Sequence, residues 1–355
     1  QRYSSELFNE MPEVDAFLGV NDYEALPGLL DSLDERRIIA NPCTETELPQ
    51  VSVRADGSMY SATLKIAEGC NNRCAYCIIP FIRGNYRSKR QEAVIAEAKA
   101  LAEAGCRELI LIAQDTTYYG YDLYGEYRLP QLLKQLCQID GIRWIRLMYC
   151  YEDRITDELI QTIREDNKIC NYLDIPIQHA SDNILKAMKR RSTNRSITDK
   201  IAKLKEQIPD IHIRTTLITG FPGETEEDFD TLYDFVAEQR FARLGVFAYS
   251  QEEGTVAGQM PNQIDEEIKT ERADSIMRLQ MEISLEENRS KIDTVQEVIV
   301  DEIDEDGSYI GRTRYDAPEI DNAVIFTGKQ EHKPGDMVMV HIDDAFDYDL
   351  AGTEV

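Results

Sequence analysis

The chain has 355 residues, of which 42% are hydrophobic and 30% charged, and its 39 basic and 66 acidic residues give a formal net charge of −27. This composition is typical of a globular protein with room for two or three domains. No apolar run approaches the roughly 20 residues that span a bilayer. The excess of acidic residues argues against a general binder of phosphate backbones, which needs clustered Lys and Arg.

Residues 1–58 follow no regular pattern and contain one cysteine, Cys43. They show no basic-then-apolar signal sequence. The chain begins at Gln1 rather than Met, so we expect it to be a piece of a longer protein.

Between about residues 60 and 290, short apolar runs alternate with amphipathic stretches. The apolar runs predict strands at 62–67, 109–113, 144–149, 172–177, 211–218 and 244–249. The amphipathic stretches predict helices at 92–104, 129–138, 156–164, 183–189, 197–207 and 225–239, followed by a charged helix at 265–290. Strands joined by helical crossovers form a parallel sheet. That sheet is either a partial barrel or a doubly wound open sheet.

Three cysteines, Cys70, Cys74 and Cys77, form a C-x3-C-x2-C array directly after the first predicted strand. Clustered thiolates select iron–sulfur clusters, zinc or Cu(I). A 4Fe-4S cluster normally takes four thiolates, so three would leave one iron open for a substrate or cofactor. The alternatives are a structural zinc loop, which needs a fourth Cys or His, and three unrelated buried cysteines. We favour the cluster because no ligand spacing relates the four histidines, which are His179, His212, His332 and His341.

Four further cysteines, Cys106, Cys137, Cys150 and Cys170, lie in or beside predicted helices and strands. We expect them to be buried, unreactive thiols. Free thiols of this kind are typical of the reducing cytosol, so we expect a cytoplasmic location.

Reactive groups of a (β/α) barrel gather at the carboxyl ends of its strands. The cysteine array follows the first strand, as this rule requires. The polar and glycine residues of interest after strands two, four and five are Gln114, Gln178, His179, Gly220, Gly223 and Glu224. Glycines allow a backbone to approach a ligand closely. A single histidine is more often a structural residue than a ligand, and we expect this of His179.

Residues 290–355 change to short strands at 296–300, 308–314, 322–326 and 337–342, separated by turn signals at 306–307, 327–328 and 334–335. These strands predict a small antiparallel barrel of the OB type. The segment holds 17 acidic against 5 basic residues. Such a surface repels phosphate and attracts a basic protein.

The cysteine array, with Tyr76 just before its last cysteine, resembles the signature of the radical S-adenosylmethionine (SAM) superfamily. The runs 65–70 and 78–84 resemble the methylthiotransferases of that superfamily. The resemblance to its ribosomal-protein aspartate methylthiotransferases is closer than to the tRNA-modifying relatives and covers nearly the whole chain. It rests on the runs 113–120, 147–149, 174–180, 214–225 and 316–322.

This resemblance implies a partial (β/α)6 radical SAM barrel followed by a TRAM barrel. Residues 1–58 would be the remnant of an N-terminal domain, 59–289 the radical SAM domain and 290–355 the TRAM domain. SAM would bind the open iron, and an electron from the cluster would cleave it to methionine and a 5'-deoxyadenosyl radical. The enzyme would add a methylthio group to the β-carbon of an aspartate on the twelfth small-subunit ribosomal protein.

The resemblance also implies the residues of the SAM pocket. They are Tyr76, Gln114, Gln178, Arg214, Gly220 and Glu224. The tyrosine is expected at the adenine, the two glutamines at the methionine or ribose, the arginine at the SAM carboxylate and the glycine on the adenine side. Capping of the following helix is the alternative for Glu224. No catalytic residue is expected beyond the three cluster ligands.

The family begins with a domain that carries three more cysteines for a second 4Fe-4S cluster involved in sulfur delivery, and this sequence contains no second triad. We therefore expect one cluster here, a second in the longer protein, and SAM cleavage without sulfur insertion. The expected partners are a basic ribosomal protein of the small subunit, bound through the acidic barrel, and an electron donor. Neither a membrane nor nucleic acid is expected as a direct target.

Three other functions stay open. A tRNA adenosine methylthiotransferase shares the core chemistry, but its C-terminal barrel should be basic. An iron–sulfur electron-transfer protein would normally saturate its cluster with four cysteines. A binding module would use the C-terminal barrel alone. Iron content and SAM cleavage separate an enzyme from the last two.

Overall fold

The computed structural model describes residues 3–20, 22–32, 36–41 and 59–355. Cys43 lies outside these residues. Among them, no helix combines the length and the apolar character that crossing a bilayer requires.

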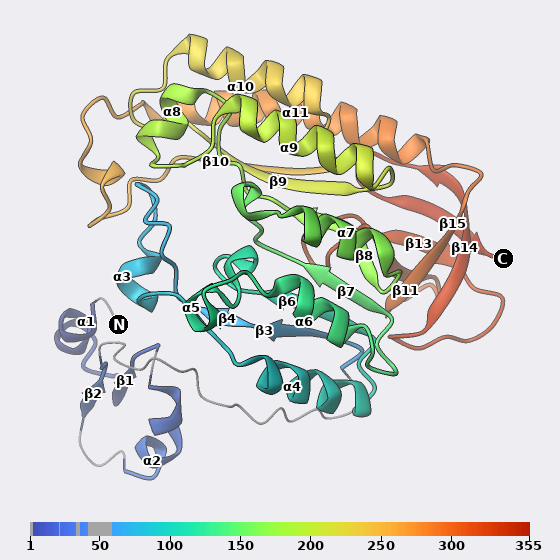
Figure 1. Ribbon diagram of the computed structural model, residues 1–355, viewed down its shortest axis with the longest axis horizontal. Helices are drawn as coiled ribbons and strands as arrows, with labels where there is room; N and C mark the ends of the chain where they lie inside the picture. Colours follow the sequence, from blue (N-terminus) through green and yellow to red (C-terminus); the bar gives the residue numbers. More distant parts are fainter. Residues whose placement is uncertain (1–2, 21, 33–35, 42–58) are drawn as a thin grey trace.

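Six parallel strands form the central sheet, and every strand predicted between residues 60 and 250 is present (Figure 1). They are β3 (Ser61–Lys65), β6 (Glu108–Ile112), β7 (Trp144–Leu147), β8 (Ile169–Asp174), β9 (His212–Thr219) and β10 (Arg243–Ala248). The spatial order β3-β6-β7-β8-β9-β10 follows the chain without reversal, and β3 is not paired with β10. A doubly wound sheet would reverse its order at a switch point. The sheet is therefore a partial (β/α)6 barrel.

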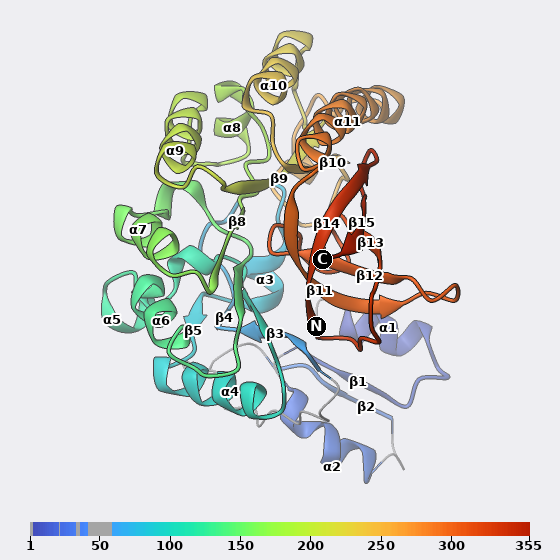
Figure 2. The ribbon, with the colours of Figure 1, turned by 90° about the vertical axis from the view of Figure 1, so that its right-hand side faces the viewer.

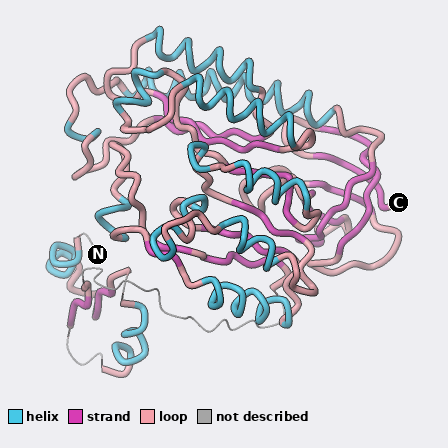
Figure 3. The backbone as a smooth tube through the Cα atoms, in the orientation of Figure 1, coloured by secondary structure: helices cyan, strands magenta, loops and turns pink. Residues whose placement is uncertain are grey.

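The connecting helices lie on the outside of the strands (Figure 3). They are α4 (Gln91–Glu103), α6 (Leu129–Leu136), α7 (Asp157–Glu165), α8 (Asp182–Ala187), α9 (Asn194–Gln207), α10 (Glu226–Gln239) and α11 (Glu266–Arg289). Local sequence explains their ends: Gly105 takes φ +101° just after α4, and Thr225 caps α10 by accepting a hydrogen bond from the Asp228 amide. The predicted alternative that Glu224 caps this helix is wrong, because the next residue does so.

Short elements surround the sheet at its edges. Before it lie α1 (Ser4–Glu10), β1 (Ala16–Leu18), α2 (Leu26–Leu30) and β2 (Arg37–Ile39), with β1 and β2 paired in parallel. Next to the cysteine loop lie β4 (Ala67–Glu68), α3 (Ile79–Arg83), β5 (Arg87–Ser88) and α5 (Tyr121–Tyr124). The segment before the sheet, from α1 to β2, contains more regular secondary structure than the sequence predicted.

The C-terminal region is a closed five-stranded barrel. Its strands are β11 (Val295–Ile303), β12 (Tyr309–Thr313), β13 (Val324–Thr327), β14 (Met337–Ala345) and β15 (Leu350–Glu354). The prediction of a wholly antiparallel barrel is wrong in one pair, because β13 and β15 run in parallel. The sequence also missed β15, whose glycine and neighbouring acidic residues have low strand propensity. The domain boundaries at 58 and 289 stay predictions.

The C-terminal barrel covers the end of the sheet at which the strands begin (Figure 2). Glu108, the first residue of β6, forms ion pairs with Arg146 of β7 (2.9 Å) and Arg312 of β12 (2.6 Å). Arg243, the first residue of β10, forms a 2.5 Å ion pair with Asp316. The run 316–322, which carries part of the family resemblance, therefore lies in the contact between the two barrels.

Substitution of Asp316 tests how much this contact between the two barrels contributes to stability. Burial raises the pKa of its carboxyl, but the Arg243 and Lys291 cations outweigh burial and hold the pKa at about 2. The ionised carboxylate thus stabilises the fold above its unfolded pKa of about 3.9, and this stabilisation is lost as pH falls through about 2. Because Asp316→Asn leaves a buried arginine without its counter-charge, we expect the free energy of unfolding to fall by about 3–5 kcal/mol at neutral pH.

Denaturant unfolding at pH 7 and pH 3 measures this effect. Asp304→Asn, at an exposed carboxylate of the same barrel, is the matched control and should change stability by less than about 0.5 kcal/mol. The difference in the free energy of unfolding between the Asp316 variant and the original chain should become smaller at pH 3. Equal stability of the two variants at pH 7 would show that the ion pair contributes nothing to docking.

Candidate active site

The cysteine loop leaves the carboxyl end of β3 and is held on several sides. Cys70 and Cys74 are buried, and Cys77 is half-buried. The Cys70 amide donates to the Gly84 carbonyl (3.2 Å), and Ala75 exchanges backbone hydrogen bonds with the loops after α8 and β10, through Met188 (2.9 Å) and Ala257 (2.8 Å). The backbone of the loop that carries the three thiols is thus held by contacts to distant parts of the chain.

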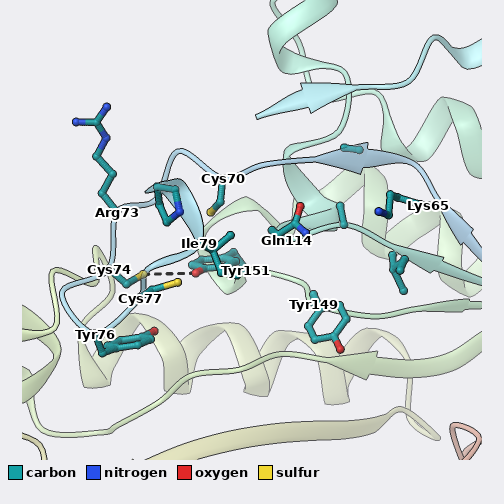
Figure 4. A pocket seen from close by; sticks show the side chains of 14 residues that line it. Lys65, Cys70, Arg73, Cys74, Tyr76, Cys77, Ile79, Gln114, Tyr149 and Tyr151 are labelled. Carbon is teal, nitrogen blue, oxygen red and sulfur yellow. Dashed lines mark hydrogen bonds between the residues drawn. The ribbon is translucent and has the colours of Figure 1, made fainter. Parts of the chain in front are cut away.

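A cavity of about 350 Å³ opens beside the thiols (Figure 4). Its lining comes from the cysteine loop and from the carboxyl ends of β3, β6 and β7. The lining residues are Lys65, Ala67, Cys70, Arg73, Cys74, Tyr76, Cys77, Ile79, Pro80, Ile112, Ala113, Gln114, Tyr149 and Tyr151. The cavity is mainly apolar and aromatic with a few polar groups, which is typical of a cofactor pocket.

A buried polar network holds the loop from behind. The Asn72 side-chain amide donates to Asp115 (2.9 Å) and accepts from Arg154 (2.8 Å), and Arg154 also pairs directly with Asp115. Asp115 in turn accepts a hydrogen bond from Thr117 (2.7 Å). These contacts fix the loop segment between Cys70 and Cys74 before any ligand binds.

Burial disfavours the charged thiolate form of two of the cysteines, Cys70 and Cys77. Burial raises the pKa of Cys70 to about 11 and raises that of Cys77. Metal ligands must be thiolates, so loading releases protons from these cysteines. Within the described ranges, no three His, Cys, Asp or Glu side chains converge to hold a single metal ion. A cubane cluster takes each thiolate on a different iron, and three thiols around an open cavity fit that group.

Tyr151 contacts the cysteine triad directly. Its Oη lies 3.5 Å from the Cys74 Sγ, as the dashed line in Figure 4 marks. The Arg190 guanidinium lies 4.3 Å from the centre of the Tyr151 ring and forms a 3.0 Å ion pair with Glu152. The phenol is therefore held in place beside one predicted cluster ligand.

Two of the predicted SAM-binding residues lie in the cavity, namely Tyr76 and Gln114. The Gln114 side-chain nitrogen donates to Glu68 (3.1 Å). Its side-chain oxygen is buried and has no hydrogen-bond partner among the described residues. An unpaired buried amide oxygen is costly, so Gln114 can accept a hydrogen bond from a ligand in the cavity.

The other four predicted SAM-binding residues are not among the described residues that line this cavity. The Gln178 amide donates to the Pro176 carbonyl (3.3 Å). Arg214 is only the third residue of β9 and pairs with Asp174 (3.1 Å) and with Asp321 of the C-terminal barrel (3.3 Å). The structure does not support a SAM-carboxylate role for Arg214, because the residue lies toward the opposite end of the strand with its charge compensated.

Gly220 and Glu224 belong to a buried structural network. Glu224 accepts from the Gly220 amide (2.9 Å), pairs with Arg272 (2.7 Å) and contacts the His179 ring (3.2 Å). A Cβ at Gly220 would overlap the Lys269 side chain, so the glycine allows α11 to pack closely. His179 is fully buried with both ring nitrogens engaged, which confirms its predicted structural role.

Lys65, Tyr149 and Tyr151 also line the cavity, and none of them was predicted as a site residue. Tyr149 and Tyr151 follow β7, the third strand of the sheet, where no site residue was predicted. The rule that located Gln114 after the second strand would have found them. Lys65 ends the first strand and was assigned only to the family resemblance.

The scattered cysteines behave as predicted. Cys106, Cys137, Cys150 and Cys170 are buried free thiols. Burial raises the pKa of Cys106 and of Cys137 to about 12, so neither is a reactive thiolate.

Two family models match the chain. Residues 64–236 match the Radical SAM superfamily, and residues 292–355 match the TRAM domain. The chain resembles the coproporphyrinogen III oxidase HemN from Escherichia coli, a radical SAM enzyme, with a TM-score of 0.50 and 15% identity over 73% of this chain and 66% of that one. At this identity the likeness shows the fold alone.

Several relatives are much more similar to this chain in sequence. The ribosomal protein uS12 methylthiotransferase RimO of Clostridioides difficile is 50% identical over 99% of this chain and 80% of its own length. The enzyme of the same name from Desulforamulus reducens is 51% identical over the same shares. Since relatives of this name share about half of the aligned residues over 99% of the chain, the chain belongs to the RimO family of radical SAM methylthiotransferases.

Proposed function

We propose that this chain is the SAM-cleaving part of an enzyme that methylthiolates the β-carbon of an aspartate on ribosomal protein uS12 in the cytoplasm. The observation that carries the proposal is identity of about half the residues with uS12 methylthiotransferases over almost the whole chain. The site supports it, because three thiols and a cavity meet at the carboxyl ends of the strands.

Different residues of the cavity have different proposed roles. Cys70, Cys74 and Cys77 would hold one 4Fe-4S cluster, which when bound supplies the electron that cleaves SAM. Tyr76 offers an aromatic face for adenine and Gln114 a free amide oxygen. The Asn72 network keeps the loop rigid, so that the reacting groups are positioned before substrate binds.

The first test separates SAM cleavage from sulfur transfer. The 355 residues contain eight cysteines but only one triad, and the family's sulfur delivery uses a second. With reductant, the reconstituted chain should release 5'-deoxyadenosine yet leave uS12 unmodified. Liquid chromatography measures the nucleoside, and mass spectrometry of uS12 measures the product. A methylthio group formed by this chain alone would contradict the expectation of a second cluster.

The acidic C-terminal barrel is the proposed contact for uS12. Asp304, Glu305 and Asp306 are exposed in the turn after β11. Asp301, which the sequence placed in the same run, instead pairs with Arg312 (3.0 Å) and accepts from Tyr60, so it belongs to the contact between the two barrels. The exposed charges form a patch that complements a basic ribosomal protein.

A second acidic patch lies elsewhere on the barrel. Asp343 and Asp344, near the end of β14, and Asp347, just after it, are exposed. In the β11–β14 ladder Val295 pairs with His341, while the turn after β11 begins beyond the other end of the ladder. The two patches therefore lie at opposite ends of this strand pair.

Charge reversal tests the first patch. Replacing Asp304, Glu305 and Asp306 by lysine should lower the association rate with uS12 about tenfold or more at low salt, and the difference should shrink as salt shortens the Debye length from roughly 10 Å. Stopped-flow mixing measures the rate. The matched control reverses Glu267, Glu271 and Asp274, three exposed residues of α11. An unchanged rate in the first variant, or tight tRNA binding by the original chain, would contradict the proposed partner.

A further inference from the structure

The charged residues of the cavity have the opposite sign from the chain as a whole. The chain carries 66 acidic and 39 basic residues, yet the charged residues among those lining the cavity are Lys65 and Arg73. In Figure 4 the Arg73 side chain points away from the thiols and from Gln114, whereas Lys65 lies across the cavity with Gln114 between it and Cys70. A cation at that position is available to an anionic ligand.

Lys65 is held in place without being neutralised. Its ammonium forms a 2.7 Å ion pair with Glu68, and its side chain keeps 42% of its surface exposed. Glu68 also pairs with Arg83 (3.3 Å). Two cations therefore share one buried carboxylate, and a net positive charge remains at this end of the cavity.

Gln114 adds a hydrogen-bonding group next to this charge. Its nitrogen is bound to Glu68, so its buried and unpartnered oxygen faces a ligand as an acceptor. An ammonium, a carboxylate-bound amide and three thiols thus line one cavity. That set of groups can bind an amino-acid residue through its carboxylate at one end while the reactive cofactors occupy the other.

We propose that Lys65 binds the side-chain carboxylate of the target aspartate and thereby positions its β-carbon. The inference rests on the proposed function. The β-carbon is directly bonded to the carboxylate carbon, so a cation that fixes the carboxylate also fixes the carbon that loses hydrogen. Hydrogen transfer requires the reacting atoms to be held at about 3–3.5 Å, and small displacements cost large factors in rate.

The experiment uses a uS12 peptide that contains the target aspartate and a second peptide with asparagine in its place. Asparagine has the same shape without the charge. The reconstituted original chain should bind the aspartate peptide about tenfold more tightly, as expected for a charge-assisted hydrogen bond. Lys65→Met should remove this preference by weakening binding of the aspartate peptide alone. Lys65→Arg should restore part of it. Fluorescence anisotropy measures the binding.

A second measurement uses deuterium to test whether the aspartate β-carbon is positioned for hydrogen transfer. With a peptide deuterated at the aspartate β-carbon, deuterium should appear in 5'-deoxyadenosine with the original chain. The share of the released 5'-deoxyadenosine that carries deuterium should fall about tenfold with Lys65→Met. The matched control is Lys134→Met, which removes a surface ion pair with Glu158 away from the cavity. It should leave this share unchanged.

The outcomes separate the possible roles of the lysine. Loss of SAM binding in Lys65→Met with an intact aspartate preference would overturn the inference and assign the lysine to the methionine carboxylate of SAM. Unchanged binding and deuterium transfer in that variant would overturn the inference but leave the proposed function standing. If the original chain binds neither peptide, the proposed function fails and the inference fails with it.

Discussion

Replacing Cys70, Cys74 and Cys77 together by alanine should remove all cluster iron from the reconstituted chain. The original chain should hold about four irons, from one cubane cluster. The variant should hold none, because the three thiols that line the cavity are the proposed protein ligands of the cluster. SAM cleavage should fall to background, at least about 100-fold, because cluster chemistry supplies the electron. Iron and sulfide analysis, visible absorbance and 5'-deoxyadenosine release measure these changes.

Cys106→Ala is the matched control for the triad. Its thiol is also buried and free, but it lies outside the cavity. The control should keep the full iron content. Stoichiometric zinc in the original chain, with no iron–sulfur absorbance after anaerobic reconstitution, would contradict the cluster and return the array to a structural zinc loop.

Gly69→Ala should abolish cluster loading through the backbone rather than through a ligand. Gly69 has φ +81°, and a Cβ there would overlap the Asn85 carbonyl oxygen and lie 2.8 Å from the Gly84 oxygen. The Gly84 oxygen also accepts the Cys70 amide hydrogen bond. Any shift that relieves the overlap therefore displaces Cys70. We expect iron content to fall at least about tenfold, since a displaced ligand is a lost one.

Gly105→Ala separates this overlap from ordinary left-handed strain. Gly105 has φ +101° but open space where the Cβ would lie. Both variants carry a backbone strain of about 1–2 kcal/mol. This strain should lower the thermal stability of both by similar amounts. Only the Gly69 variant should lose iron. Full iron content in Gly69→Ala would show that the loop relaxes without moving Cys70.

Local sequence was sufficient to predict the parallel sheet with its helices and to propose the cluster ligands. The six parallel strands and the outer helices follow from the alternation of apolar and amphipathic runs, which depends on each segment's own periodicity. The cysteine array is likewise contiguous, so its chemistry could be inferred from spacing. The C-terminal strands were predicted from turn signals, but β15 was not, because its pairing with β13 and β14 compensates for weak intrinsic propensity.

Placement of the remaining site residues required the tertiary structure. Gln114 and Gln178 both follow predicted strands, yet only Gln114 reaches the cavity, because the local course of each loop decides where a side chain points. The family motif implies a SAM contact for Arg214, but one of its two carboxylate partners, Asp321, lies more than a hundred residues away in the C-terminal barrel. Periodicity and spacing describe contacts within one segment. Ion pairs, unpaired polar atoms and the sign of charge in a cavity arise between segments, and only the folded chain brings those segments together.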